Sequence, residues 1–468
     1  MKLGELIGSD NNSVIELSED TKDLQVLGLS YDSRTTTTGD MFFCLKGESH
    51  DGHDFAARAV KKGATVLVVD RELDLDTPQI VVDDTRATMG DYAETFYHSP
   101  SNELITVAVT GTNGNTTTIN LLSEIAKAAG EKPETIGTLT GSLTTPEAPD
   151  LQRKIRELVG QGTSFLAMEV SSHALSQNRI SNMLFDITIF TNLSLDHLDY
   201  HGSMESYYRA KSKLFTANHS KLAILNNQNS YGRRLSREIP IPKLDFSLED
   251  IEILDQSLRN SSWLWEGEII DLNLAGKFNI ENALGAAIAA NALGFSKQAI
   301  KTGLSKINGI PGRFESIAKK DNQPDVIVDY SHTPDGLQKV LTTIKELSNE
   351  AIVHVLFGCG GDRDKSKRSE MGRISEEYSS HIYLTSDNPR SENQMNIIND
   401  ILAGIRDKSS VYVNPDRREA IHQAIKSANA QDVVLIAGKG CEAYQEVEGT
   451  FSSFQDIEVA KEALEARG

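Results

Sequence analysis

The stretch from Leu104 to Leu122 constrains the fold of this chain more than any other. It consists of an apolar strand, the Gly-rich turn Gly111-Thr-Asn-Gly-Asn-Thr-Thr117 and the start of a helix. Backbone N–H groups in such a turn, together with the positive end of the new helix, favour an anion. Because a strand precedes the turn and a helix follows it, the sequence predicts a phosphate-binding loop.

One residue of this turn departs from the usual pattern. The position before Thr116, where a phosphate-binding loop carries the lysine that reaches the outer phosphates, holds Asn115. A neutral amide cannot supply that positive charge. Losing one donor to the transition state typically costs about a hundred- to a thousandfold in rate. Asn115 therefore bears directly on whether the chain turns over a nucleotide.

The length and charge of the chain limit its class. A chain of 468 residues predicts about three domains, which we place at residues 1–100, 101–314 and 315–468. The formal net charge of -20 argues against nucleic acid or an anionic membrane as the main partner. The N-terminus lacks an apolar run of signal-peptide length, and no later stretch approaches transmembrane length. We therefore expect a protein without membrane insertion.

The cysteines exclude two further classes. Cys44, Cys359 and Cys441 are scattered and form no CxxC pair. Neither a disulfide framework nor a zinc site is indicated. This usage fits a reducing compartment, and the expected location is the cytoplasm.

The first domain is predicted to be a small α/β unit. The patterns indicate strands at 26–31, 40–45, 64–70 and 79–82 and a helix at 55–62. Polar turns such as Asp32-Ser-Arg34 could hold a ligand, although turn chemistry alone explains them.

The central domain alternates strands and helices, the pattern of a mostly parallel sheet covered on both faces. Predicted strands at 164–170 and 185–192 run into polar clusters that contain Glu169 and His197. Ligands gather at the carboxyl ends of parallel strands, so these side chains should meet the phosphate-binding loop. A carboxylate, an imidazole and the hydroxyl of Thr116 beside phosphates indicate a hard cation, most simply Mg²⁺.

The third domain repeats the theme and resembles a Rossmann-like α/β unit. We interpret the segment Pro311-Gly-Arg-Phe-Glu315 as the hinge before this domain, because its Pro-Gly pair interrupts the strand-helix pattern. Four polar or Gly-rich clusters follow its strands, at 329–335, 358–365, 386–390 and 438–442. A dinucleotide site is the natural rival interpretation, but no GxGxxG follows the first strand.

Together these strings resemble the Mur ligases of peptidoglycan synthesis over essentially the whole chain. The supporting strings are Asp32-Ser-Arg34, Glu169-Val-Ser-Ser-His-Ala-Leu175, Thr191-Asn-Leu-Ser-Leu-Asp-His-Leu-Asp-Tyr-His201, Asp329-Tyr-Ser-His-Thr-Pro334 and Gly360-Gly-Asp-Arg-Asp364. The resemblance implies three α/β domains, with a central ATPase-type mostly parallel sheet between a small N-terminal domain and a Rossmann-like C-terminal one. It also implies an ATP-dependent amide ligase that works through an acyl phosphate, with ATP as co-substrate and Mg²⁺ as cofactor.

The resemblance assigns roles by position. Thr116, Glu169, His197 and a carbamylated Lys211 would serve magnesium, and the last three would be catalytic. The nucleotide would contact Gly111, Thr112, Asn113, Gly114, Asn115, Thr116, Thr117, Asn279, Asn282, Arg313, Asp329 and His332. Carbamylation would turn the Lys211 ammonium into an anion, which can bind a cation rather than repel it.

The other substrates implied are UDP-N-acetylmuramoyl-dipeptide and meso-diaminopimelate, bound by a monomer. The first would contact Ser33, Thr144, Thr145, Ser171, Gln177 and Arg179, and the second Arg363, Asp387, Asn388, Pro389, Arg390, Gly438 and Glu442. Arg390 offers a two-pronged donor to the carboxylate that diaminopimelate has and lysine lacks. Besides Asn115, Leu143 and Cys441 depart from the family pattern, in place of Asn and His.

Two rival functions remain open from the sequence. Asn115 would fit a non-catalytic relative that binds the UDP-precursor or a partner ligase. A folylpolyglutamate-type ligase is the other option, against which the first domain and the Asp387-Asn-Pro-Arg390 string argue. In an active ligase, the third domain should close on the second about a hinge near Gly312.

Overall fold

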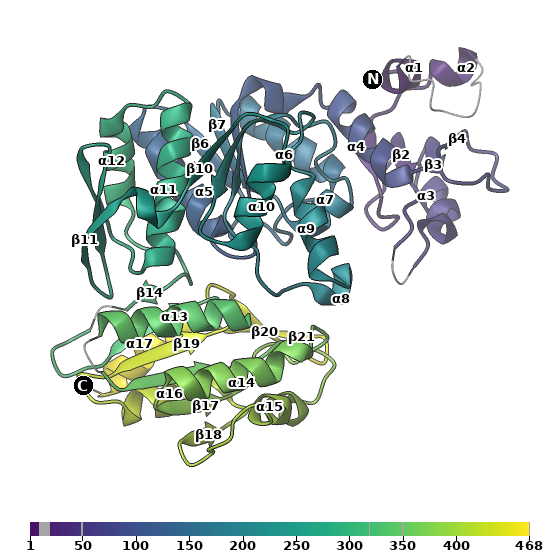
Figure 1. The fold of residues 1–468 in the computed structure, drawn as a ribbon. Coiled ribbons are helices and arrows are strands. Elements are labelled where there is room, and N and C mark those ends of the chain that lie inside the picture. The colour runs from purple at the N-terminus through teal and green to yellow at the C-terminus, as the bar shows by residue number, and fades with distance from the viewer. Residues whose placement is uncertain (9–18, 48–49, 318, 349–350, 468) are drawn as a thin grey trace.

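The computed structural model describes residues 1–8, 19–47, 50–317, 319–348 and 351–467. Figure 1 shows three parts in space: a purple N-terminal unit at one end, a central unit beside it, and a green-to-yellow C-terminal unit below the central one. The α/β class with mostly parallel sheets is as predicted. The exact limits of the three predicted domains stay a prediction.

The N-terminal unit contains a parallel sheet in the order β1-β2-β3-β4. Its elements are β1 (Gly28–Ser30), β2 (Asp40–Phe43), β3 (Val66–Val69), β4 (Gln79–Val81), α1 (Leu3–Ile7), α2 (Glu19–Lys22), α3 (Ala56–Lys61) and α4 (Thr85–Phe96). Separate apolar clusters cover the two faces of the sheet. An ion pair of 3.0 Å between Arg86 and Glu147 ties α4 to the central unit.

The central sheet places the phosphate-binding loop at its switch point. Its parallel strands run in the order β10-β9-β8-β5-β7-β6. They are β5 (Ile105–Thr110), β6 (Pro133–Ile136), β7 (Phe165–Glu169), β8 (Phe185–Phe190), β9 (Ser220–Asn226) and β10 (Lys243–Phe246). Strands β7 and β8 flank β5 on opposite sides, which is where ligands bind in open α/β sheets.

Both faces of this sheet are covered, which explains its near-continuous apolar strands. Val107 and Val109 of β5 join one core with α5 (Asn115–Ala128) and α11 (Lys277–Ala292), while Ala108 joins the core on the other face. The remaining helices are α6 (Ala148–Gly160), α7 (Ser172–Ser176), α8 (Leu198–His201), α9 (Met204–Ser212), α10 (Ser230–Glu238) and α12 (Lys297–Lys306). Helical spacing in the sequence predicts a helix at 204–215, and the structure ends α9 three residues earlier, at Ser212.

A small antiparallel sheet in this unit was not predicted. It comprises β11 (Glu252–Gln256), β12 (Ser261–Trp265) and β13 (Glu268–Leu272). Trp263 and Ile270 pack into the core beside α5, whereas Leu264 and Ile269 lie on the outer face. The alternation follows from the two-residue period of strands.

The C-terminal sheet has the order β14-β15-β19-β16-β17-β18, parallel except for the β14–β15 pair. Its strands are β14 (Glu315–Ser316), β15 (Asp325–Asp329), β16 (Val353–Phe357), β17 (His381–Leu384), β18 (Val411–Val413) and β19 (Val433–Ala437). The helices are α13 (Pro334–Leu347), α14 (Ser366–Tyr378), α15 (Gln394–Leu402), α16 (Arg417–Ser427) and α17 (Asp456–Arg467). Helix α14 and the hairpin β20 (Tyr444–Val447) to β21 (Thr450–Ser453) were not predicted.

The connection between the central and C-terminal units is tightly packed. Gly312 has a φ of 64°, and a Cβ atom there would lie 2.1 Å from the backbone nitrogen of Cys441. Only glycine fits such a close approach at positive φ. The connection therefore rests on the loop at 438–442, a contact that sequence spacing did not reveal.

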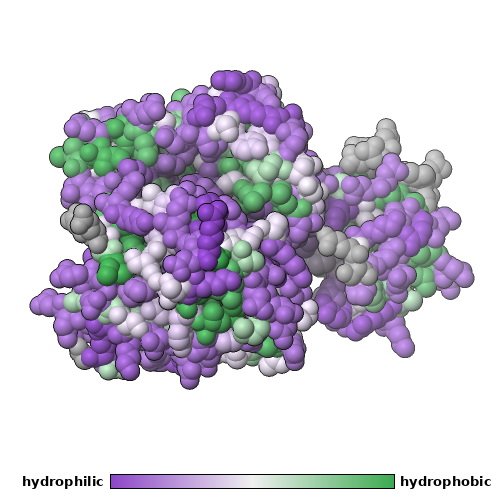
Figure 2. Space-filling model, turned by 60° about the horizontal axis from the view of Figure 1, so that its bottom comes forward, coloured by the Kyte–Doolittle hydropathy of each residue, from purple (hydrophilic) through white to green (hydrophobic). Residues whose placement is uncertain are grey.

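The surface is mainly hydrophilic on the face that Figure 2 shows. Hydrophilic residues cover most of the face in Figure 2, interrupted by smaller hydrophobic patches, and the N-terminal unit projects to one side. In the described part of the chain, no helix combines the length and apolar character that crossing a membrane requires.

Candidate active site

The phosphate-binding loop forms as the sequence predicts. Gly114, with a φ of 91°, ends the turn, and α5 begins at Asn115. A Cβ atom on Gly111 would lie 1.9 Å from the Thr191 hydroxyl, so the loop must lie flat against the end of β8. The first turn of α5 leaves its amides free for an anion.

Asn115 is held within the loop. Its Nδ2 donates to the Gly111 carbonyl over 2.9 Å, and its Oδ1 accepts from the Thr191 hydroxyl over 3.2 Å. The side chain therefore stabilises the loop but adds no positive charge to it.

Glu169, at the end of β7, lies beside the loop. Its Oε1 accepts hydrogen bonds of 2.9 Å from the Thr116 hydroxyl and from the Thr138 amide. Burial raises the pKa of this carboxyl above its ordinary value. Arg313 reaches the same point, with its Nη2 3.2 Å from the Thr116 hydroxyl and its guanidinium over the Tyr330 ring.

Lys211 of α9 is buried on the other side of the loop. Its Nζ donates to the Gly111 carbonyl over 2.8 Å and to the Thr110 hydroxyl over 3.2 Å. Burial lowers its pKa to about 7. A large fraction of this amine is therefore neutral near neutral pH, the form that reacts with electrophiles.

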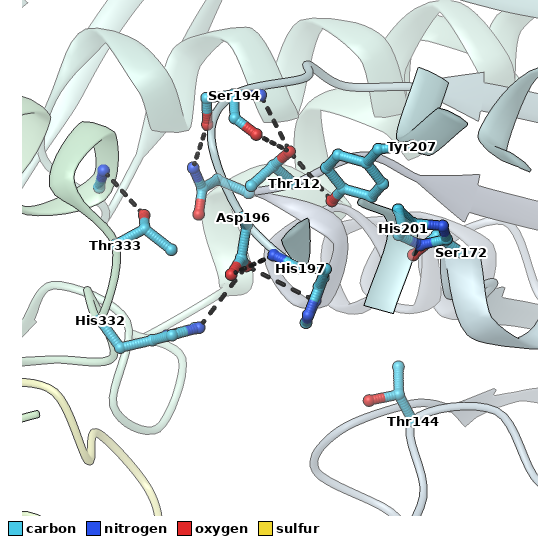
Figure 3. A network of polar contacts seen from close by, with 12 residues as sticks. Thr112, Thr144, Ser172, Ser194, Asp196, His197, His201, Tyr207, His332 and Thr333 are labelled. Carbon is cyan, nitrogen blue, oxygen red and sulfur yellow. Dashed lines mark hydrogen bonds and ion pairs between the residues drawn. The ribbon is translucent and has the colours of Figure 1, made fainter. Parts of the chain in front are cut away.

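Asp196 links the central and C-terminal units. His197 Nε2 lies 3.5 Å and His332 Nε2 lies 3.8 Å from its Oδ2, and Figure 3 shows both rings converging on it. Burial lowers the pKa of His332 to about 4, and burial also lowers the pKa of His197. Burial alone would raise the pKa of Asp196, but the histidines and Lys367 lower it overall.

The structure brings the predicted nucleotide and magnesium residues together around one cavity of about 260 Å³. Its lining includes Gly111, Thr112, Asn113, Gly114, Asn115, Thr116, Thr117, Glu169, His197, Lys211, Asn279, Asn282, Arg313, Asp329 and His332. These residues come from both the central and the C-terminal unit.

A larger cavity of about 1010 Å³ adjoins it. Of the residues predicted for the other two substrates, its lining includes Thr144, Thr145, Ser171, Arg179, Arg363, Asp387, Asn388, Arg390, Gly438 and Glu442. The two cavities share the lining residues Thr138, Thr144, Ser171, Asp196, His197, Tyr330 and His332. They therefore meet at Asp196, His197 and His332, which we call the Asp196 cluster. In Figure 3, Thr144 faces this cluster across an open space.

Three predicted site residues lie outside both linings: Ser33, Gln177 and Pro389. Ser33 is buried in the N-terminal unit. The Gln177 side-chain oxygen instead accepts hydrogen bonds of 3.1 and 2.6 Å from Arg179, which it orients. Pro389 packs against Gly361, where a Cβ atom would lie 1.9 Å from the Pro389 carbonyl.

Two of the residues predicted to bind the amino-acid substrate, Arg390 and Glu442, already make hydrogen bonds or ion pairs within the protein. Arg390 donates from Nη1 to the Gly361 carbonyl over 2.8 Å, and its Nε lies 3.3 Å from Glu446. Glu442 Oε2 accepts from Asn388 over 2.8 Å and from the buried Lys439 over 2.9 Å. Lys439 therefore fixes the position of Glu442.

Sequence reasoning missed five further residues at these cavities. Tyr207, Tyr330, Lys339 and Lys367 line them, and Lys439 lies behind Glu442. Tyr330 and Lys439 lie within the polar clusters at 329–335 and 438–442, so the sequence did indicate their location. Lys367 follows the polar cluster at 358–365 by two residues and carried no signal of its own.

The donor set suits a hard cation that shares its coordination with phosphates. Thr116 and Glu169 offer oxygen ligands beside the phosphate-binding loop, as Mg²⁺ prefers. Among the described residues, no group of three or more His, Cys, Asp or Glu side chains is arranged to hold a metal ion by itself. Nucleotide oxygens would have to complete the shell, which Mg²⁺ commonly allows.

These features define a P-loop nucleotide-binding α/β protein in which the cavity at the phosphate-binding loop adjoins a larger one. Family models match along the chain: the Mur ligase family catalytic domain at 25–97, the Mur ligase middle domain at 109–290, and the Mur ligase glutamate ligase domain at 312–440. The chain belongs to the Mur ligase family, which confirms the resemblance of its motifs.

Individual relatives agree with the family models. The UDP-N-acetylmuramoyl-L-alanyl-D-glutamate--2,6-diaminopimelate ligase of Geobacillus kaustophilus is 40% identical over 469 residues, covering 95% of this chain and 96% of its own. A solved structure of a ligase of that name has a TM-score of 0.69 and 33% identity, covering 100% of this chain and 99% of its own. The ADP complex of MurF from Thermotoga maritima, at 19% identity and a TM-score of 0.66, shares the fold and covers 96% and 100%.

Proposed function

We propose that this chain is an ATP-dependent ligase that joins meso-diaminopimelate to UDP-N-acetylmuramoyl-L-alanyl-D-glutamate during peptidoglycan synthesis. The observation that carries the proposal is the contact between two cavities, one lined by the phosphate-binding loop and the other by Arg390 and its neighbours. The names of the relatives at 40% identity support it. We propose the domain limits 1–100, 101–314 and 315–468, action as a monomer, and the cytoplasm as its location.

The reaction has two steps. An oxygen of the glutamate carboxylate bonds to the γ-phosphorus of ATP while the bond to the β-bridging oxygen breaks, which releases ADP. The diaminopimelate amine then attacks the carbonyl carbon of the acyl phosphate, phosphate leaves, and the amine loses its proton. Activation makes the carboxylate carbon an electrophile, and positive charge around the phosphoryl group lowers the barrier.

The roles of the residues follow from their contacts. The amides at 114–117, where α5 begins, would hold the phosphates, and Arg313 would approach them from beside Thr116. Asn279, Asn282, Asp329 and His332 would contact the rest of the nucleotide. Thr116, Glu169, His197 and carbamylated Lys211 would hold Mg²⁺, which supplies Lewis-acid stabilisation of the transferring phosphoryl group.

The two carboxyl substrates would occupy the larger cavity. Thr144, Thr145, Ser171 and Arg179 line it on the central side, and we propose that they bind the UDP-dipeptide, with Gln177 orienting Arg179. Ser33 would act from the N-terminal unit. On the C-terminal side, Arg363, Asp387, Asn388, Arg390, Gly438 and Glu442 would bind the amino acid, and Pro389 would support them from outside the cavity by packing against Gly361.

Carbamylation of Lys211 predicts a dependence on pH and bicarbonate. Below its pKa of about 7 the amine is protonated and cannot attack CO₂, whereas above it the neutral amine can. With the concentration of dissolved CO₂ held equal at both pH values, the initial activity of protein kept free of CO₂ should therefore recover at pH 8, and about tenfold more slowly at pH 6.

The measurement is the rate of reactivation after rapid dilution into assay buffer. Lys213→Ala serves as a control, because its side chain lies two residues away on an exposed position. Equal reactivation with and without bicarbonate would contradict carbamylation of Lys211.

The test of the function is phosphate release by the purified protein. Release that requires ATP, Mg²⁺, UDP-N-acetylmuramoyl-dipeptide and meso-diaminopimelate together is the expected result, with the tripeptide product identified by mass. A folate substrate should release none.

Asn115 favours one alternative, a non-catalytic relative that binds the UDP-precursor or a partner ligase. That function predicts binding of the UDP-dipeptide without ATP affinity in the presence of Mg²⁺. A calorimetric titration with ATP distinguishes the two.

A further inference from the structure

The cations around the two cavities differ in whether they have partners. Lys211, Arg313, Lys339, Arg179 and Arg390 each pair with a protein group: Gly111, Thr116, Asp335, Glu147 and Glu446, respectively. Arg363 is exposed to solvent. Lys367 is 8% exposed, and among the described residues no hydrogen bond or ion pair engages its Nζ.

The Lys367 Nζ is not among the buried polar atoms that lack a partner, so the ammonium opens onto the cavity while its stem is buried. Fully buried charges in proteins normally have a counter-charge or hydrogen bonds, whereas this ammonium is free to bind an anion in the cavity. The neighbouring side chain shows the usual arrangement: Arg368 pairs with Glu392 over 2.9 Å and with Asp400 over 2.9 Å. Arg368 thereby anchors the first turn of α14, from which Lys367 also extends.

The charge of Lys367 acts where the two cavities meet. Lys367 lines the larger cavity together with Asp196, His197 and His332, which also line the nucleotide cavity. After burial, its positive charge is the largest influence that lowers the pKa of His332. It also contributes to the lowered pKa values of Asp196 and His197.

We propose that the Lys367 ammonium contacts the γ-phosphoryl group as it passes from ATP to the substrate carboxylate, supplying positive charge that Asn115 does not. This rests on the proposed ligase function. The transferred group must pass from the nucleotide cavity to the larger one, and Lys367 lines the larger cavity together with Asp196, His197 and His332, which line both. The new O–P bond forms as the bond to ADP breaks, and the step requires no proton transfer.

Lys367→Met tests the proposal, because methionine keeps the apolar stem and removes the charge. It should lower kcat about ten- to a hundredfold, the value of one hydrogen bond to a charged group, while the KM values change less than about threefold. Lys367→Arg should recover part of the loss. Lys365→Met is the matched control, since Lys365 is an exposed side chain that pairs with Glu392 over 3.0 Å.

A second measurement does not depend on turnover. Calorimetry with ADP, Mg²⁺, aluminium fluoride and the UDP-dipeptide reports binding of a mimic of the transferring phosphoryl group. Lys367→Met should weaken this complex about tenfold or more and leave the affinity for ADP alone unchanged. Lys367→Gln replaces the methionine variant if melting shows that the latter does not fold.

The outcomes separate the proposal from the function. A kcat within about threefold of the unmodified protein would overturn the role of Lys367, as would a loss confined to the KM for diaminopimelate, which indicates a carboxylate ligand instead. If the unmodified protein releases no phosphate, the proposed ligase function is wrong. Binding of the aluminium fluoride complex then still tests whether Lys367 contacts the phosphoryl group. Equal binding by protein and variant, or none by either, overturns the proposal.

Discussion

Asn115→Lys should raise the rate of phosphoryl transfer about a hundredfold, the typical value of one charged donor to a transition state. Asn115 lines the nucleotide cavity at the first residue of α5, so a longer side chain can reach the outer phosphates. The change gives up two hydrogen bonds, to Gly111 and from Thr191, which cost about 1 kcal/mol each. A small loss in melting temperature should therefore accompany the gain in kcat.

Asn115→Gln provides the control, because it lengthens the side chain without charge and should not raise kcat. Single-turnover phosphate release, measured for both variants, separates the chemical step from product release. If Asn115→Lys stays within about threefold of the unmodified protein, Lys367, Arg313 and Mg²⁺ already neutralise the phosphoryl group.

We expect the largest effect in the ratio of kcat/KM for meso-diaminopimelate to kcat/KM for lysine as the amino-acid substrate. Diaminopimelate carries a carboxylate that lysine lacks, and a site built to bind such a group typically rejects the analogue without it by about ten-thousandfold in kcat/KM. Arg390 uses Nε and one N–H of Nη1 within the described structure, which leaves the other N–H of Nη1 and both of Nη2 for a substrate carboxylate. Arg390→Met should reduce the preference to about tenfold, since two charged hydrogen bonds are worth about a thousandfold.

The preference is measured from kcat/KM for meso-diaminopimelate and L-lysine, with Arg418→Met as the control. Arg418 is a surface residue that pairs with Glu462 away from both cavities, so the control should keep the full preference. Equal use of the two amino acids by the unmodified protein would contradict the role of Arg390.

The fold class and the phosphate-binding loop could be predicted because their signals are local. A strand, a Gly-rich turn and a helix follow one another within 104–122, and the structure has them at β5 and α5. Two hairpins were missed although their turns carried a signal. Glu266-Gly267 and Glu448-Gly449 each join two short strands, and all four residues have positive φ, as two-residue hairpin turns require.

The arrangement around the cavities could not be derived from spacing. Lys367 and His332 lie on different elements of the C-terminal unit, and Asp196 comes from the central one, so only tertiary packing brings them together. The same applies to Gln177, whose side chain binds Arg179 rather than a cavity. Burial also decides which cation lacks a partner, and the sequence does not encode that directly.

The packing of Gly312 has a mechanical consequence. Its backbone touches the backbone of Gly440 and Cys441, so the interdomain connection and the loop beside Glu442 cannot move independently. An amino acid that immobilises this loop should thereby stiffen the connection, while an empty loop leaves it free to flex. If the amino acid binds beside Glu442 as proposed, we expect its binding to restrict the relative motion of the central and C-terminal units.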